Sequence, residues 1–260
     1  MKFKIILSGY LLLILTITGC KKNTYHITER TTNDGAAQVK LGYFSAYTVT
    51  PNTILYINDV QISNTLAAPI SFPGGGQNMN GLSNGDYLYV KPGSTKIQGF
   101  RPIPGTGNIM NKLFEFTEVF NANTNYTFYI TDTASSTAGF SLEDTKGKPD
   151  SGFARFKFVN IMPNVPAVDL YKGLNVTVAT LVQGNISYKS SSPAFDLALP
   201  IVDSFFIRPA GAPTSAPVIA RRFFALSNQR IYTMLARGYN VVNPPFSNTL
   251  LPNISVIVNQ

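Results

Sequence analysis

The chain has 260 residues and a formal net charge of +8 at pH 7, with 44% hydrophobic and only 13% charged residues. This apolar content argues against a chain disordered by composition, and the length suits one large domain or two ordinary ones. The positive residues are scattered, the densest groups being Lys21-Lys22 and Arg221-Arg222, and no basic helix or zinc motif accompanies them. The charge therefore does not indicate nucleic acid as a partner.

The first twenty residues have the organisation of a bacterial lipoprotein signal. Lys2 and Lys4 form a charged start, Ile5 to Ile17 is almost wholly apolar, and the small residues Thr18-Gly19 precede Cys20. Cleavage before Cys20, the only cysteine in the chain, would expose a thiol that can be acylated. The segment resembles the lipobox of bacterial lipoproteins, with an isoleucine where leucine is commoner.

Two alternatives to lipidation are an ordinary secretory signal with an incidental cysteine and an uncleaved spanning helix. The apolar run is shorter than the ~20 residues that a bilayer needs, which argues against the helix. We therefore expect a signal peptide at residues 1–19 and lipidation at Cys20. The protein would be lipid-anchored to the outer membrane in the cell envelope of a Gram-negative bacterium of the Bacteroidetes type. Whether it faces the periplasm or the cell surface stays open.

Residues 20–37 are polar and show no apolar period. Such a segment predicts a flexible tether between the lipid and the first folded strand. His26, the only histidine of the chain, lies in this tether with no packed surroundings to hold it.

From Val39 onward the chain repeats itself, which predicts two copies of one fold with loops of different length. Blocks of similar pattern recur in the same order while the spacers between them change. The matched blocks are Val39–Phe44 with Ala154–Val159, Pro51–Tyr56 with Pro166–Tyr171, Tyr89–Pro92 with Phe206–Pro209, and Asn125–Tyr129 with Ile231–Leu235.

The matched blocks are rich in aromatic and β-branched residues and alternate with polar ones, which is typical of strands. Breakers such as Pro73-Gly74-Gly75-Gly76 and Asn243-Pro244-Pro245 separate them, and no stretch of a dozen residues keeps helical spacing. The expected fold class is all-β, with two tandem immunoglobulin-like antiparallel β-sandwich domains. Their expected bounds are residues 38–144 and 152–260.

One run in the second copy, ARFKFVNIMPNVPAVDLY from Ala154 to Tyr171, resembles the opening strand pair of the DUF4397 domain. Phe140 to Asp144, followed by Pro149 and Gly152, resembles the segment that joins the two halves of that domain. The likeness extends over about Val39 to Gln260 but is specific only in the second copy. It implies an exported bacterial protein with an immunoglobulin-like β-sandwich, often duplicated. It implies no active site, because the family has no settled activity.

The sequence predicts no catalytic residue, no cofactor and no metal site. A nucleophile that His26 could activate would have to be held beside it, and a tether does not hold residues rigidly. One histidine and one acylated cysteine cannot supply the usual zinc ligands.

Pairs of carboxylates are the remaining candidates for acid–base chemistry, since glycoside hydrolysis uses two acids close together. Glu115 and Glu118 differ by three in an expected strand and should face opposite sides of the sheet. Glu143-Asp144 is expected in a surface turn, where a weak calcium site with Asp150 is an alternative. The other candidates are Asp196 with Asp203, and Asp169, which we expect to bond a neighbouring backbone or turn.

Aromatic side chains could instead provide a sugar-stacking surface, with Tyr43, Tyr47, Tyr87 and Tyr89 as candidates. The chain has no tryptophan, and aromatic residues on strands mostly fill a core. Extra loop length at Pro102–Asn111 and Asn240–Pro252 marks two places where binding could occur.

Two functions follow from these patterns. The first is a non-catalytic, lipid-anchored envelope protein that serves adhesion or scaffolding through the loops of two β-sandwich modules, with an unknown envelope protein as partner. The alternative is an accessory glycan-binding lipoprotein of a polysaccharide-uptake system. An enzyme is the third and least supported class.

Overall fold

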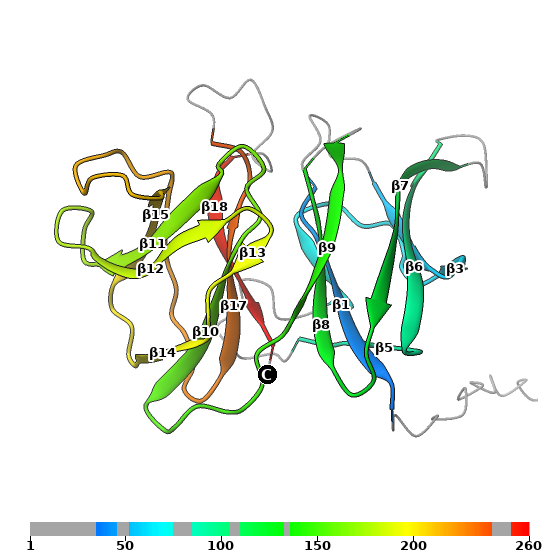
Figure 1. Ribbon diagram of the computed structural model, residues 1–260, viewed down its shortest axis with the longest axis horizontal. Coiled ribbons are helices and arrows are strands. Elements are labelled where there is room, and N and C mark those ends of the chain that lie inside the picture. The colour runs from blue at the N-terminus through cyan, green and yellow to red at the C-terminus, as the bar shows by residue number, and fades with distance from the viewer. Residues whose placement is uncertain are drawn as a thin grey trace, which may run out of the picture. The chain divides into compact units, whose positions relative to one another are not determined.

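The computed structural model describes residues 35–45, 52–74, 85–103, 110–132, 136–240 and 251–259 (Figure 1). Cys20, His26, Tyr47 and most of the predicted tether lie outside these ranges, as do residues 104–109 and 241–250 of the two long loops. Residues 34–260 form one compact unit. Within the described ranges, no helix has the length and apolar character needed to cross a membrane.

The first half of this unit is a sandwich of two sheets. Its strands are β1 (Ala37–Tyr43), β2 (Ile54–Ile57), β3 (Val60–Gln61), β4 (Ile70–Phe72), β5 (Leu88–Val90), β6 (Gly93–Pro102), β7 (Met110–Phe120), β8 (Asn125–Thr131) and β9 (Ala138–Glu143). One sheet has the order β4-β1-β8-β9, with β5 also paired to β1, and the other has the order β3-β2-β6-β7.

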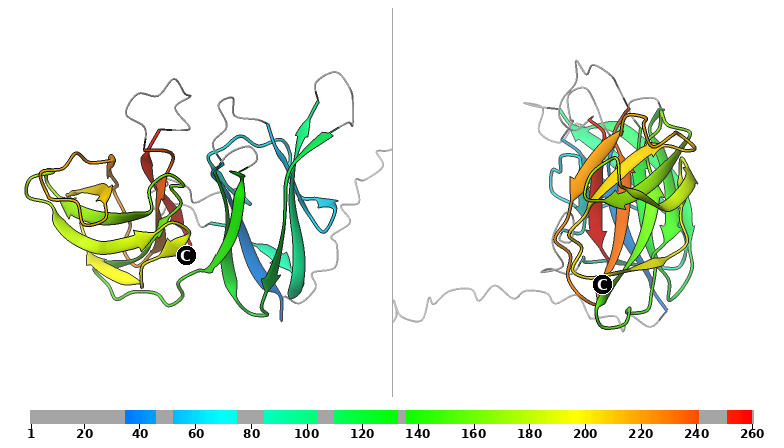
Figure 2. Two further views of the ribbon diagram at one scale, coloured as in Figure 1. Left: turned by 45° about the horizontal axis from the view of Figure 1, so that its top comes forward. Right: turned by 90° about the vertical axis from the view of Figure 1, so that its left-hand side faces the viewer.

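The second half is built in the same way. Its strands are β10 (Phe153–Asn160), β11 (Ala167–Gly173), β12 (Thr180–Ser187), β13 (Ser190–Ser191), β14 (Phe195–Ala198), β15 (Ser204–Pro209), β16 (Ala220–Phe223), β17 (Ile231–Arg237) and β18 (Asn253–Val258). The sheets are β13-β10-β17-β18, with β14 also on β10, and β12-β11-β15-β16. Figure 2 shows β11 and β12, in yellow-green, in a layer apart from the red β18.

Every strand pairing of the first half recurs nine strands later in the second half. Three of the four blocks matched in the sequence fall on strands that are equivalent in this topology. The match of Tyr89–Pro92 with Phe206–Pro209 is wrong, because Tyr89 lies in β5 and Phe206 lies in β15, the counterpart of β6. Aromatic and apolar residues before a cation and a proline can end any strand, so this short pattern was not specific.

The all-β class and the two sandwich-like halves are confirmed, whereas the immunoglobulin-like antiparallel arrangement is not. β1 pairs in parallel with β8, and β10 pairs in parallel with β17, so one sheet of each half is mixed. Strand patterns in a sequence specify which residues face inward but carry little information on strand direction. β1 begins at Ala37, within the range predicted as tether.

Each half has its own apolar core between its two sheets. In the first half, Val39 and Leu41 of β1 face Phe128 of β8 within one cluster. In the second half, Phe156 and Phe158 of β10 join Met234 of β17 in another. The alternation seen in the sequence of these strands therefore corresponds to their inward faces.

The opposite faces of the two mixed sheets meet in a third apolar cluster, here called the seam. Its fully or nearly fully buried members are Phe44, Tyr129, Val159, Ile161, Leu235 and Ile257, which come from both halves. Thr131 Oγ1 donates to Ile161 O at 2.8 Å across the seam. The central strands of both mixed sheets are consequently buried on both faces, as parallel strands usually are.

Candidate functional site

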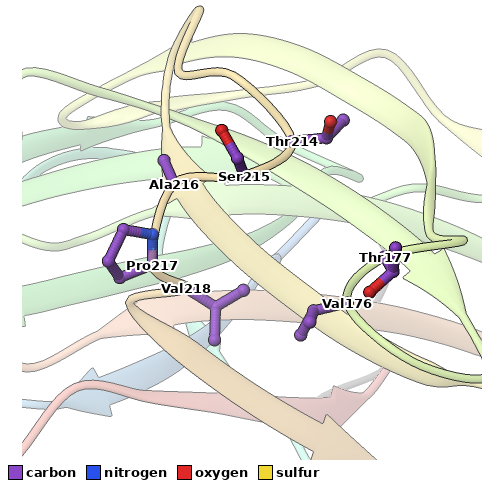
Figure 3. Close-up of a pocket in the computed structure, with 7 residues that line it drawn as sticks. All are labelled: Val176, Thr177, Thr214, Ser215, Ala216, Pro217 and Val218. Carbon is purple, nitrogen blue, oxygen red and sulfur yellow. The ribbon is translucent and has the colours of Figure 1, made fainter.

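Two loops of the second half enclose a hollow of about 480 Å³ (Figure 3). The β11–β12 loop contributes Val176 and Thr177, and the β15–β16 loop contributes residues 214–218. Figure 3 shows three hydroxyl-bearing side chains, Thr177, Thr214 and Ser215, among apolar ones. The hollow therefore offers mixed polar and apolar contacts on two loops that a folded sheet supports.

Arg208 of β15 fixes both loops to the sheet. It is fully buried, its Nη2 donates to Val176 O and Thr214 O at 2.9 Å, and its Nε donates to Ala216 O at 3.3 Å. The guanidinium carbon lies 4.7 Å from the centre of the Tyr171 ring, a favourable cation–π distance. Since all three carbonyls belong to residues that line the hollow, Arg208 determines its shape.

Asp169 of β11 holds two turns beside the same loops. Its Oδ1 accepts from Asn185 N at 2.7 Å and its Oδ2 accepts from Gly211 N at 2.9 Å. Asn185 and Gly211 both have positive φ, at 56° and 72°, so the carboxylate stabilises backbone turned away from regular strand geometry. The structural role expected for Asp169 is confirmed.

The β11–β12 hairpin exposes four large apolar side chains. Leu174 is 67% exposed, Val176 38%, Val178 59% and Leu181 56%. No charged residue occurs between Leu174 and Leu181. β12 is also the last strand of its sheet, so its outer edge has no strand partner among the described residues. Clustered exposed apolar residues mark interaction surfaces, and this group is here called the apolar hairpin.

A second hollow, of about 450 Å³, lies beside the seam and has a mainly polar lining. It is lined by Gln38, Gly85, Tyr87, Asn125, Thr145, Lys146 and Asn259. Asn259 follows β18 of the second half, whereas the other six residues precede β10. Residues of both repeats are thus needed to form this seam hollow.

A buried charge cluster lies next to the seam hollow. Lys40 is fully buried, its Nζ donates to Val258 O at 3.0 Å, and it lies 4.4 Å from the centre of the Tyr87 ring. Asp144 accepts from Tyr87 OH at 2.8 Å and from Thr127 Oγ1 at 2.9 Å. The expectation that Asp144 lies in a surface turn is wrong, because this carboxylate is only 7% exposed.

Burial dominates the ionisation of this cluster. Desolvation lowers the pKa of Lys40 to about 8, although the nearby carboxylates of Asp144 and Asp86 oppose the shift. Desolvation also raises the pKa of Asp144, against the attraction of Lys40, and raises the pKa of the Tyr87 hydroxyl. Shifted groups can indicate an active site, but an ion-pair network in a packed interface shifts them equally well. The bond from Lys40 to a carbonyl of the other repeat favours the structural role.

The other carboxylates expected as candidates already have partners. Glu115 lies on the exposed side of β7 and accepts hydrogen bonds from Gln98 and Lys112. Glu118 is four residues after the inward-facing Phe114 and so lies on the same side of the strand as Phe114. The prediction that the two acids face opposite sides of the sheet is confirmed. Asp196 pairs with Arg155, at 2.7 Å, and Asp203 pairs with Lys172. Among the described residues, no group of three or more His, Cys, Asp or Glu could hold a metal ion.

The structure separates the four tyrosines named as sugar-stacking candidates. Tyr43 is fully buried and hydrogen-bonds Thr53, so the prediction was wrong for it. Tyr47 lies outside the described residues, and Tyr89 is 56% exposed on β5. Tyr87 lines the seam hollow, and Tyr89 lines a smaller hollow of about 290 Å³ in the first half.

Sequence inspection missed most residues of both hollows. The three carboxamides of the seam hollow, Gln38, Asn125 and Asn259, are separated by more than eighty residues from one to the next. The second-half hollow lies in loops other than the two long ones singled out in the sequence. Usable signals existed at Tyr87, one of the aromatic candidates, and at Asp169, a charge within an apolar strand.

The sequence profile of the family described as "Domain of unknown function (DUF4397)" matches residues 39–171. This match covers just over half of the chain. The chain belongs to the DUF4397 family. The resemblance to this family is thereby confirmed. Ala154–Tyr171, interpreted as the opening strand pair of the domain, lies at the end of the matched range, and the match also takes in the first repeat, in which no specific likeness had been expected.

Solved structures similar to this DUF4397 chain include two carbohydrate-binding modules. One is a family 26 module of Eubacterium rectale Amy13K in complex with maltoheptaose. It is 10% identical with a TM-score of 0.23, and the alignment covers 82% of this chain and 99% of the module. A family 41 module from streptococcal virulence factors is 11% identical, with coverages of 84% and 96% and a TM-score of 0.24. The fimbrial anchor protein Mfa2 from Porphyromonas gingivalis is 10% identical, with coverages of 86% and 95% and a TM-score of 0.20.

Scores this low give no basis for transferring a function to the DUF4397 chain. A search of the curated proteins finds no match.

The buried cluster of the DUF4397 chain predicts a specific pattern of stabilities. Asp144→Asn leaves the Lys40 ammonium buried without its carboxylate, so the free energy of unfolding should fall by about 3 kcal/mol. The double variant Lys40→Met, Asp144→Asn removes both charges and should regain most of that loss. Urea unfolding followed by circular dichroism measures both values.

The pH dependence gives a control. Because the pKa of Lys40 lies near 8 in the folded state and higher when unfolded, the unfolded chain holds more protons above pH 8. The free energy of unfolding of the wild-type protein should therefore rise between pH 8 and pH 10, when compared with that of the Lys40→Met variant over the same range. A double variant less stable than either single variant would contradict the proposed pairing.

The role of Asp169 predicts a contrast with an exposed carboxylate. Asp169→Asn replaces a carboxylate that accepts two charge-assisted, partly buried hydrogen bonds with a neutral group that has one acceptor oxygen, and should lower the free energy of unfolding by about 1–3 kcal/mol. Asp196→Asn breaks a partly exposed ion pair and should cost at most about 1 kcal/mol. Equal losses in the same unfolding assay would show that Asp169 has no special structural role.

Proposed function

We propose that this DUF4397 protein is a non-catalytic, lipid-anchored envelope protein that binds a protein partner in adhesion or scaffolding. The observation that carries the proposal is the apolar hairpin. Cys20 supplies the anchor, residues 21–34 supply the reach up to the first residues bonded to the sandwich, and the sandwich presents the hairpin.

The hairpin supports protein binding because its exposed side chains are aliphatic and are supported by a rigid base. Ala179 of the hairpin packs with Tyr171 and Phe206 in a small buried cluster, against which Val218 of the facing loop also packs. Arg208 holds the carbonyl of Val176 itself. A surface fixed in advance loses little conformational freedom when a partner covers it.

A non-catalytic role is supported by the state of the ionisable groups. Asp144, Asp169, Asp196 and Asp203 each have a hydrogen bond or ion pair that fixes the fold or joins strands. A general base needs a side chain free to take a proton from substrate in a reachable position. These carboxylates are engaged in other contacts.

Lipid anchoring is tested by replacing the acyl acceptor. Cys20→Ala removes the thiol and should abolish incorporation of a labelled fatty acid in cells that produce the protein. Cys20 is the only cysteine, so no second thiol can substitute. A labelled band of unchanged intensity in the variant would refute the anchor.

Partner binding is tested by site-specific cross-linking in intact cells. A photo-cross-linking residue in place of Val178 should yield a discrete protein adduct after irradiation, because this position is exposed at the centre of the hairpin. The further substitution Leu181→Asp should remove the adduct, since a charge on the apolar surface opposes burial.

The matched control is Val119 on β7, which is 62% exposed but lies in the first repeat. The same cross-linker at this position should give no discrete adduct. Absence of an adduct at position 178, or an equal adduct at both positions, would contradict hairpin-mediated binding.

A further inference from the structure

We infer that the seam hollow is a binding site for a neutral saccharide. The inference goes beyond the hairpin function, because it concerns a different surface and a ligand of another class. It rests on the lining of the hollow, on one buried acceptor without a partner, and on the way both repeats build its walls.

The lining has the chemistry that hydroxyl groups need. Gln38, Asn125 and Asn259 contribute carboxamides, each with a donor and an acceptor side by side, and Thr145 contributes a hydroxyl. Neighbouring hydroxyls of a pyranose also present donors and acceptors side by side, so a carboxamide can pair with two of them. Tyr87 adds an aromatic surface for the C–H groups of a sugar ring.

Asn259 supplies the observation that points to a ligand. It is only 7% exposed, and its Nδ2 donates to Thr233 Oγ1 at 2.8 Å, which fixes the orientation of the amide. Its Oδ1 is buried and has no hydrogen-bond partner in the described structure. A buried acceptor without a partner costs stability. The atom itself is closed to solvent, so a ligand hydroxyl would reach it only after a small shift of the wall of the hollow.

The charges around the hollow favour a neutral ligand. Lys146 is the one ionic side chain of the lining, and its Nζ already donates to Asn123 O at 2.8 Å. The ammonium of Lys40, behind the wall, is bonded to Val258 O and attracted to Asp144. With one exposed ammonium and no arginine, the lining has no bidentate group to hold a carboxylate, so it is less suited to an acidic sugar.

The wall beside Lys40 is set in advance. A Cβ at position 85 would lie 2.3 Å from Val258 O and 2.5 Å from Lys40 Nζ, so only glycine fits between the two repeats there. The volume of about 450 Å³ is within the ~300–1,000 Å³ of small-ligand sites. A preformed polar hollow of this size suits one or a few sugar units.

The test passes the full chain, purified in detergent, over immobilised neutral polysaccharides (starch, mannan, xylan and galactan) and acidic ones (pectin and alginate). At least one neutral polymer should retard the protein. Gln38→Ala and Asn259→Ala should each weaken the Kd for oligosaccharides of that polymer about tenfold, as loss of a central contact does.

Gln183→Ala is the matched control, since Gln183 is a half-buried carboxamide on β12 that does not line the hollow. Its Kd should stay within about twofold of wild type, the size of change expected from a residue outside the contact. Gln38 is only partly buried, so its variant keeps the test valid if Asn259→Ala unfolds.

No retention on any neutral polymer, retention on acidic polymers alone, or a Kd unaffected by both variants would overturn the inference. The hairpin proposal would survive each of these results, because its cross-link at position 178 does not depend on the seam hollow. Loss of that cross-link, in turn, would leave the saccharide site standing.

Discussion

The seam between the repeats is the constraint on which the rest of the structure depends. A mixed sheet with a parallel central pair needs cover on both faces, and each repeat has only one second sheet to provide it. Tyr129 and Ile257, for example, face away from the cores of their own halves and are buried only in the seam cluster. Each such side chain contributes about 1.5–3 kcal/mol when it leaves water. This apolar contact lets the seam also contain Lys40 and Asp144, whose burial is unfavourable.

Above this shared framework the two repeats have diverged at equivalent positions. Ile54 pairs with Phe100 across β2 and β6, and Asp169 pairs with Arg208 across β11 and β15. In the first repeat Phe100 contacts the Tyr56 ring edge-on, with centres 4.9 Å apart, whereas the equivalent Arg208 lies over Tyr171. The ring of Phe100 has no donor, while the guanidinium donates to three loop carbonyls. The connection between β2 and β3 is a two-residue turn and does not need such bonds. The β11–β12 loop is longer, and the arginine and the carboxylate hold it and its neighbours in place.

The sequence was informative where a property repeats along the chain, and silent where it depends on distant segments. Alternating residues such as Phe156 and Phe158 identified the strands and their inward faces, and the order of the blocks indicated duplication. Strand direction could not be obtained, because a parallel and an antiparallel neighbour bury the same residues. Asp144 looked like a turn residue beside Gly147 and Pro149, and only the fold brings Tyr87 and Thr127 to it. The seam hollow was hidden for the same reason, since its carboxamides meet only when the last strand of the second repeat reaches the first.

If Cys20 is acylated as proposed, duplication and anchoring together favour weak individual contacts. Since residues 35–37 are bonded to the folded unit, the predicted tether is left with residues 21–34, fourteen residues that could extend to at most about 50 Å. Anchored in this way, the molecule would meet envelope partners at an effective concentration near the millimolar range, and a second contact would add to the first without high intrinsic affinity. An exposed hairpin of four aliphatic side chains and a shallow polar hollow are each suited to binding of that strength. The seam places both surfaces on one compact unit. A partner bound at the hairpin would therefore hold nearby saccharides close to the seam hollow, and a saccharide bound in the hollow would hold nearby proteins close to the hairpin.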